Sequence, residues 1–137
     1  GLDMAANAVY DVDINTENGA NAAFYVGYDK SFWINMVTGG TQDNDILAYL
    51  SEIPLKKDGE YRLEFDYTTT VDRDITVSVE GNNIYFSDTI KSSAEKQHFI
   101  GTFKASEDDS SANITFNIGG IDSYNVTLSN ISLIKTA

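Results

Sequence analysis

Three aromatic residues, Trp33, Tyr49 and Tyr85, lie outside the alternation that marks core positions in this sequence. An aromatic ring exposed beside asparagine, threonine or glutamate offers a flat apolar surface to the C–H groups of a sugar, and the polar neighbours can bond the sugar hydroxyls. Tyrosines on neighbouring strands also stabilise an ordinary sheet surface without binding anything. The pattern alone leaves these two interpretations equal.

Three carboxylates, Glu64, Asp66 and Glu80, could supply the pair that glycoside hydrolysis needs at about 5–10 Å. One of the two must have a pKa raised by burial, which a sequence cannot show. Nucleophilic catalysis would depend on His98, the only histidine, and no Gly-x-Ser-x-Gly elbow is present. We therefore expect a protein that is not an enzyme.

Clustered oxygen donors at Asp11, Asp13 and 43–45 (Asp-Asn-Asp) could bind Ca²⁺ in principle. Neither cluster matches an EF-hand loop, and Asp11 and Asp13 share the exposed face of a candidate strand. A single histidine excludes a multi-histidine zinc site, and zero cysteines exclude disulfides and thiolate ligands. We expect no required cofactor, with structural calcium as an open alternative.

Residues of alternating polarity must position these side chains. Apolar and polar residues alternate over 61–68, 75–80 and 113–118, which predicts strands with one buried face. Further strands are expected at Val9–Ile14, Ala22–Tyr28, Phe32–Val37, Asp45–Ser51, Asn83–Ile90, Gln97–Lys104 and Asn125–Ile134. Turn residues separate them, so the sequence predicts an all-β sandwich of two antiparallel sheets without helices, formed by one domain, residues 1–137.

Two local features qualify this pattern. The alternation slips between Ser129 and Asn130, which predicts a β-bulge. The acidic, serine-rich run 106–111 is interpreted as a solvated loop.

The composition limits the partners. The chain has 137 residues, 42% of them hydrophobic, and a net charge of −12. Such a charge opposes binding to nucleic acid and to anionic membranes, and no apolar run approaches the about 20 residues of a membrane span. Residues 1–4 show no basic and no apolar signal region, so we expect any signal peptide to lie outside this sequence.

Four segments in order carry a family resemblance: 53–65, 75–81, 112–120 and 126–133. They read as an apolar residue, a glycine turn and Tyr-x-apolar-x-Phe, then a strand pair, then apolar-x-Phe-Asn-apolar-Gly and a terminal strand. In this order they resemble carbohydrate-binding modules of families 4, 9, 16 and 22 and, more loosely, the family 86 xylan-binding module of bacterial xylanases. Residues 1–44 match poorly.

The resemblance implies a β-jelly-roll whose concave sheet holds one glycan chain in an open cleft. Carried over to this sequence, its binding positions fall on Ser51 beside Tyr49, Thr76, Asn82, Tyr85, Asn113 and Asn117, with Glu80 and Glu64 as further hydroxyl acceptors. In the alternating pattern, these positions belong to the face of each predicted strand that points away from the core. Where the family commonly has a calcium-binding aspartate, this chain has Ser129, which argues against that site, and Thr76 stands where some members have arginine.

The sequence therefore predicts a monomeric, non-catalytic module of a secreted or cell-surface glycanase. Trp33, Tyr49 and Tyr85 are expected to stack on sugar rings, while Asn82, Asn113, Asn117 and Glu80 bond hydroxyls. Xylan is the expected ligand, and a β-1,3- or β-1,4-glucan is the alternative. A structural or adhesion sandwich and a small glycan-active enzyme are the other hypotheses.

Overall fold

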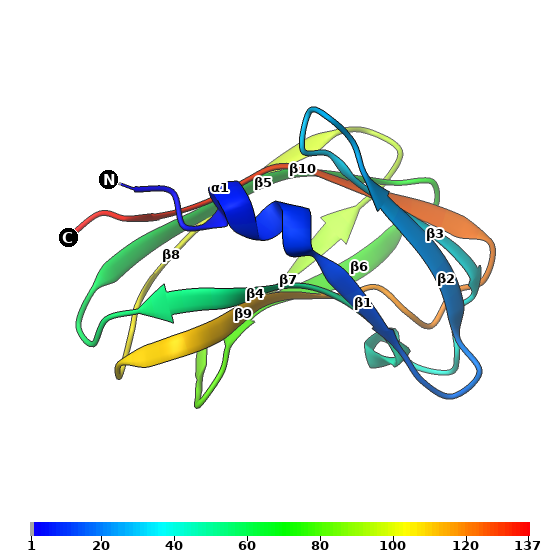
Figure 1. The fold of residues 1–137 in the computed structure, drawn as a ribbon. Helices are drawn as coiled ribbons and strands as arrows, with labels where there is room; N and C mark the ends of the chain where they lie inside the picture. Colours follow the sequence, from blue (N-terminus) through cyan, green and yellow to red (C-terminus); the bar gives the residue numbers. More distant parts are fainter. Residues whose placement is uncertain (1) are drawn as a thin grey trace.

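Two five-stranded antiparallel sheets stack face to face in the computed structural model, which describes residues 2–137 (Figure 1). Sheet 1 contains, in spatial order, β1 (Asp13–Thr16), β4 (Ile46–Leu55), β9 (Asp109–Asn117), β6 (Arg73–Glu80) and β7 (Ile84–Ser92). Sheet 2 contains β2 (Asn21–Val26), β3 (Phe32–Thr38), β10 (Tyr124–Lys135), β5 (Glu60–Thr69) and β8 (Gln97–Lys104). The predicted β-sandwich is confirmed.

The inner faces of both sheets form one apolar core. The alternation places every second residue of β5 and β9 there, because successive side chains of a strand point to opposite faces. Phe65 of β5 stacks on Phe99 at 4.9 Å between ring centroids and meets Phe116 of β9 edge-on at 5.1 Å. Phe99 lies on β8 of the same sheet, so the contact with Phe116 is the one that joins the two sheets across the core.

The N-terminal segment differs from the prediction. Residues expected to form a strand from Val9 and to contain no helix instead form α1 (Ala5–Ala8) and the 3₁₀ turn η1 (Val9–Asp11), and the first regular strand is β1. Asp3 Oδ1 accepts the N–H of Ala5, which starts the helix. Ala5 and Val9 are buried in the core, so this segment gains its stability from tertiary packing, which periodicity over a few residues does not reveal.

The predicted bulge in β10 is confirmed. Pairing of β10 with β5 shifts register between Ser129 and Ser132, and Asn130 has a left-handed φ of 52°. The Asn130 side chain donates a 2.7 Å hydrogen bond to Asp66 Oδ2 on β5. The extra residue lets both halves of β10 keep their apolar side chains on the core face.

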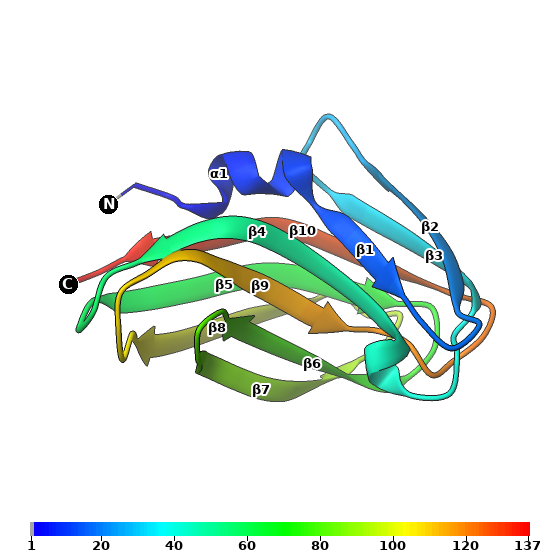
Figure 2. The same ribbon diagram turned by 60° about the horizontal axis from the view of Figure 1, so that its bottom comes forward.

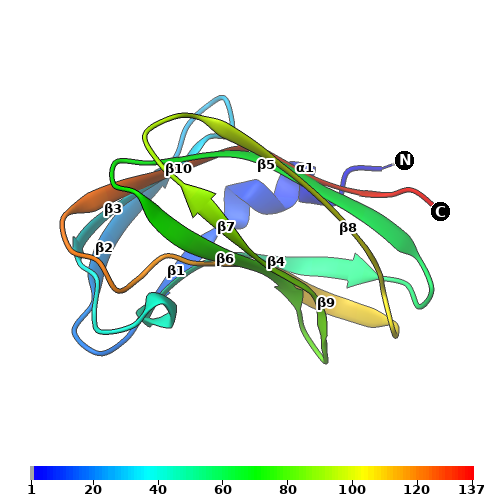
Figure 3. The same cartoon turned by 180° about the vertical axis from the view of Figure 1, so that it is seen from behind.

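The two ends of the described chain lie side by side at one end of the sandwich (Figure 3). Asp3 and Ile134 form an antiparallel bridge, Met4 N–H donates to the Leu133 carbonyl, and Asp3 Oδ1 accepts the Leu133 N–H. No helix among residues 2–137 is long and apolar enough to cross a membrane.

Candidate functional site

The outer face of sheet 1 carries polar side chains in register on its three central strands. Leu47 of β4 lies opposite Asn117 of β9, and Asn117 lies opposite Thr76 of β6. On the same face, Asn113 lies opposite Glu80. Four residues predicted from the sequence are thus brought together, because β4, β9 and β6 are neighbours and their outward residues share one parity.

A hollow of about 290 Å³ lies on this face. It is lined by Asn44, Leu47, Thr76, Ser78, Glu80, Ile84, Ser87 and Asn117. Figure 2 shows η2 (Asp43–Asp45), which contributes Asn44, near one end of these strands and the turn between β6 and β7 at the other. We call this hollow and the adjoining outer face of β4 and β9 the cleft.

Tyr49 adds an aromatic ring beside the cleft. It lies opposite Thr115 of β9 and opposite Asp13 of β1, and its hydroxyl comes within 3.5 Å of Asp13 Oδ2. Partial desolvation, together with the Asp13 carboxylate, raises the pKa of the Tyr49 phenol, which is therefore a neutral donor at physiological pH. Ser51, farther along β4, lines a separate hollow beside α1 with Asn7.

The cleft lining is almost uncharged. Glu80 is the single acidic or basic residue that lines the hollow, although the chain carries a net charge of −12. The other polar groups are hydroxyls and amides, which donate and accept hydrogen bonds without charge. Thr76 and Thr89 hydroxyls also contact one another at 3.3 Å. The arrangement suits a neutral ligand rich in hydroxyl groups and has no acid–base pair.

Tyr85 does not stand exposed in the cleft as expected. It is half-buried and packs against the core, and its hydroxyl donates a hydrogen bond to Asp109. Pairing of β6 with β7 shifts register here, so that Val79 lies opposite Phe86 and Glu80 opposite Ile84. Tyr85 is the extra residue of this bulge, and Ile84 takes the outward position instead.

Asp109 itself corrects the interpretation of 106–111 as a solvated loop. It begins β9 and is buried, where it accepts the N–H of Asn82 and of Ser111. Hydrogen bonds from the Asn82 N–H, the Tyr85 hydroxyl and the Ser111 N–H hold the pKa of the Asp109 carboxyl below its usual range. The predicted contact residue Asn82 is exposed in the β6–β7 turn that Asp109 holds.

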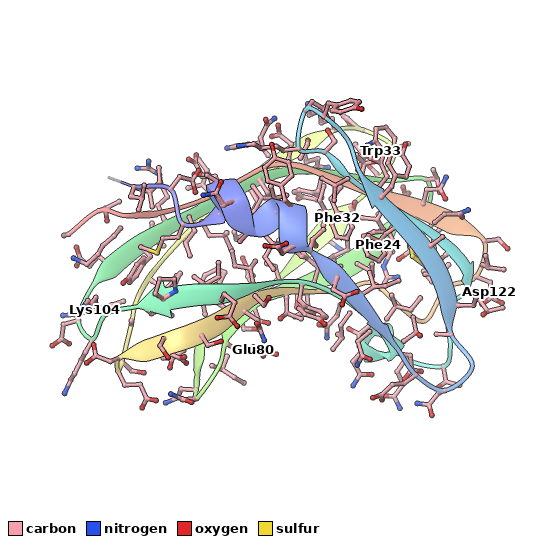
Figure 4. All side chains as sticks on the ribbon, in the orientation of Figure 1. Phe24, Phe32, Trp33, Glu80, Lys104 and Asp122 are labelled. Atoms are coloured by element: carbon pink, nitrogen blue, oxygen red, sulfur yellow. The ribbon has the colours of Figure 1, made fainter. Side chains whose placement is uncertain are left out.

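Trp33 lies away from the cleft. It belongs to β3 in sheet 2, and Figure 4 shows Trp33 and Glu80 on opposite sides of the sandwich. Its ring is 42% exposed on the outer face of that sheet, where it stacks on Tyr25. Trp33 and Tyr49 therefore cannot contact the same stretch of a ligand.

The candidate catalytic carboxylates are separated as well. Glu64 and Asp66 lie on β5 in sheet 2, whereas Glu80 lies on β6 in sheet 1, so Glu64 also lies outside the cleft. His98 lies between the first two, with Nδ1 2.6 Å from Asp66 Oδ1 and Nε2 3.3 Å from Glu64 Oε1. Hydrogen bonds to Asp66 and then Glu64 raise the pKa of His98.

One of the candidate calcium ligands, Asp45, is engaged by protein donors. Asp45 is buried and its oxygens accept hydrogen bonds from Thr41 N–H, Thr41 Oγ1, Gln42 N–H and Asn18 Nδ2. These N–H and O–H groups point at the lone pairs that a cation would use. Among residues 2–137, no group of three or more histidine or acidic side chains is close enough to hold a metal ion.

Five residues line the cleft but were not predicted as site residues: Asn44, Leu47, Ser78, Ile84 and Ser87. Leu47 shares the outward parity of Tyr49 and could have been found from that signal. Ile84 could not, because the bulge beside it reverses the parity of β7.

Sequence comparison matches residues 14–127 to the family model CBM_4_9, described as a carbohydrate binding domain. No curated protein shows significant sequence similarity to the chain.

Solved structures with this fold include carbohydrate-binding modules. One, titled "CBM4 structure and function", is 21% identical with a TM-score of 0.83, covering 96% of this chain and 90% of the other. The N-terminal cellulose-binding domain of Cellulomonas fimi β-1,4-glucanase C is 16% identical with a TM-score of 0.75, covering 92% and 89%. The Clostridium thermocellum xylanase 10B CBM22-1–GH10 modules, complexed with xylohexaose, give 10% identity and a TM-score of 0.60, covering 93% and 27%.

Proposed function

The chain belongs to the carbohydrate binding domain family CBM_4_9, and from this membership we propose that it binds a single β-linked polysaccharide chain in the cleft of sheet 1. The predicted resemblance to modules of the family 4 and 9 type is confirmed. The observation that carries the proposal is the row formed by Leu47, Asn117 and Thr76, which lie side by side on three neighbouring strands. Leu47 offers an apolar side chain, Asn117 an amide and Thr76 a hydroxyl.

Each group in the cleft has a role that fits a sugar chain. Leu47, Ile84 and the ring of Tyr49 offer apolar surface to the C–H faces of pyranose rings. Asn117 and Thr76 bond hydroxyl groups from the floor, and Asn113 and Glu80 form a second polar pair farther along the same two strands. Since these contacts stay partly solvated, we expect an affinity on the order of µM to mM.

Xylan is the proposed ligand, and a β-1,4- or β-1,3-glucan is the alternative. Structures of this fold include a cellulose-binding domain from a β-1,4-glucanase and a xylanase complexed with xylohexaose, which supports a β-linked backbone of either kind. The net charge of −12 opposes attraction to acidic polymers. Glucuronate side chains on xylan are therefore tolerated rather than sought.

The module acts without catalysis, as a monomer in a secreted or cell-surface glycanase. Binding keeps a covalently linked catalytic domain on its polysaccharide and raises the effective substrate concentration. The separation of Glu64 and Asp66 from Glu80 onto different sheets supports this role, because no carboxylate pair faces the cleft.

Affinity electrophoresis on gels containing arabinoxylan, β-glucan, laminarin or mannan tests the proposal. We expect retardation on arabinoxylan and an affinity about tenfold weaker for Asn117→Ala and Tyr49→Ala, as the loss of about 1.4 kcal/mol predicts. Thr102→Ala is the matched control, because Thr102 is exposed on β8 of the other sheet.

The outcomes separate the hypotheses. Retardation on β-glucan alone would select the glucan alternative. Migration unaffected by any of the four polysaccharides would leave a structural or adhesion sandwich. Release of reducing sugar from the same polysaccharides would identify an enzyme.

A further inference from the structure

A second hollow, on the outer face of sheet 2, is larger than the one in the cleft. Its volume is about 470 Å³, within the roughly 300–1,000 Å³ of small-molecule sites. It is lined by residues of β2, β3, β5 and β10 and by Ala94 from the loop after β7. It lies on the opposite side of the sandwich from the cleft and shares no lining residue with it. We call it the Trp33 groove.

One wall of the Trp33 groove is a pair of aromatic rings. Tyr25 of β2 lies directly opposite Trp33 of β3, and their rings are parallel, with 2° between planes and 5.9 Å between centroids. Tyr25 is 61% exposed. Figure 4 shows Trp33 directed away from the sandwich, whereas its neighbour Phe32 is directed inward. Both rings are therefore partly exposed to a ligand on the surfaces that do not face each other.

Exposed aromatic rings gather around this pair. All aromatic residues that are more than one-third exposed in the described chain come from β2, β3, the turn between them and η1: Tyr10, Phe24, Tyr25, Tyr28 and Trp33. Leaving aromatic surface in water forgoes about 25 cal/mol per Å². Phe24 packs edge-on against the buried Phe32, whereas Tyr10, Tyr25 and Tyr28 line one shared hollow beside Trp33. Exposed aromatic surface gathered in this way is typical of a binding site.

The rest of the lining is uncharged and combines hydroxyl and amide groups with apolar side chains such as Ala23, Ile34 and Val126. Trp33 lies opposite Thr127 of β10, which lies opposite Thr68 of β5, and Asn35 lies opposite Asn125. Thr70 completes this set of hydroxyl and amide groups. No acidic or basic residue lines the groove, although the chain has 30 charged residues, 9 basic and 21 acidic.

We propose that the Trp33 groove is a second carbohydrate-binding site, which takes one or two pyranose units of a neutral glycan. The parallel rings contact the C–H face of a sugar, and Asn35, Asn125 and Thr127 bond its hydroxyls. The absence of charge in the lining matches a neutral, hydroxyl-rich ligand and disfavours a nucleotide or another charged ligand. The site shares the ligand class of the proposed function but uses none of the cleft residues.

The single tryptophan makes this site directly observable. Trp33 is the only tryptophan in the sequence, so the one indole N–H signal in a ¹H–¹⁵N spectrum reports on the groove alone. Titration with xylohexaose, cellohexaose, laminarihexaose and mannohexaose should shift this signal saturably with at least one sugar. The shift should persist in Asn117→Ala, which alters only the cleft.

Groove variants complete the test. Tyr25→Ala should weaken the indole response about tenfold, as expected for loss of one stacking ring. Tyr28→Ala is the matched control, because Tyr28 is equally aromatic and fully exposed but does not line the groove. Thr127→Val removes a hydroxyl without changing the rings and should weaken the response as well.

The alternatives give distinct results. An unchanged indole signal, with shifts of the Asn117 and Thr76 amides, overturns this site and leaves the cleft proposal standing. A shifted indole signal without amide shifts in the cleft supports the groove and overturns the cleft. An indole signal that responds to protein concentration rather than to sugar identifies a second copy of the chain as the occupant and overturns the proposal.

Discussion

The Tyr85 hydroxyl donates a 2.7 Å hydrogen bond to the Asp109 carboxylate and so ties the start of β7 to the start of β9. The same carboxylate accepts the Asn82 N–H of the β6–β7 turn at 2.8 Å. This turn lies at one end of the cleft, so the bond between two residues outside the cleft shapes its edge.

Removing this bond should affect stability more than binding. Tyr85→Phe keeps the packed ring but leaves the buried Asp109 with one donor fewer, so we expect a lower melting temperature. Retardation on a polysaccharide gel should fall less than for Asn117→Ala. A variant with normal melting temperature and binding as weak as that of Asn117→Ala would instead make Tyr85 a ligand contact.

Asp45 should make the protein sensitive to acid. Hydrogen bonds from the Gln42 and Thr41 N–H groups and the Asn18 amide lower the pKa of Asp45 to about 2. Because the folded-state pKa is depressed, the stabilisation is present above the unfolded value near 3.9 and is lost as pH falls toward 2. Asp45→Asn should therefore lower the melting temperature at pH 6 and much less at pH 2. Melting curves that differ equally at both pH values would contradict this.

His98 should act in the opposite direction. Hydrogen bonds to Asp66 and Glu64 raise its pKa above the ordinary 6.5. A raised folded-state pKa stabilises the protein below pH 6.5, and the effect disappears as pH rises through the folded value. The difference in melting temperature between the protein and His98→Gln should thus be largest near pH 5.5 and absent at pH 9. An NMR titration that places the His98 pKa at or below 6.5 would rule this out.

The bulge in β10 predicts a contrast between two substitutions at Asn130. Its φ of 52° suits glycine and opposes β-branched residues. Asn130→Val should be less stable to urea than Asn130→Gly by about 1–3 kcal/mol. Both variants lose the hydrogen bond to Asp66, so the difference isolates the backbone conformation. Equal urea midpoints for the two variants would show that the conformation at position 130 can change without loss of stability.

Strand alternation predicted much of the cleft. The outward parity of Asn113 and Asn117 on β9 and of Thr76 on β6 is a local property, since period 2 sets which face a side chain occupies. Family resemblance added which of these outward faces belong together. The same alternation identified the β-bulge at Asn130, because the apolar residues stand at even-numbered positions before it and at odd-numbered positions after it.

Long-range pairing explains what the sequence did not reveal. Strict alternation from Ser87 predicts an outward side chain at Tyr85. Phe86 pairs with Val79 and Ile84 pairs with Glu80, so Tyr85 between them is unpaired and the alternation along β7 shifts by one residue. For Trp33, the exposed parity was correct, since Phe32 and Ile34 are buried on either side. Its sheet is decided by the pairing of β3 with β10, about 90 residues away, which no local pattern encodes.

The bridge between Asp3 and Ile134 has a mechanical consequence. Because the paired segments are antiparallel, both ends of the described chain point the same way from this bridge, and Thr136 and Ala137 remain hydrogen-bonded to Glu60 of β5. A force that pulls the two ends apart would act on the bonds of Asp3 and Met4 to Leu133 at one end and on the bonds of Thr136 and Ala137 to Glu60 at the other, and would then peel α1 from the core. Tension would thus unzip this module at low load, instead of shearing many hydrogen bonds at once.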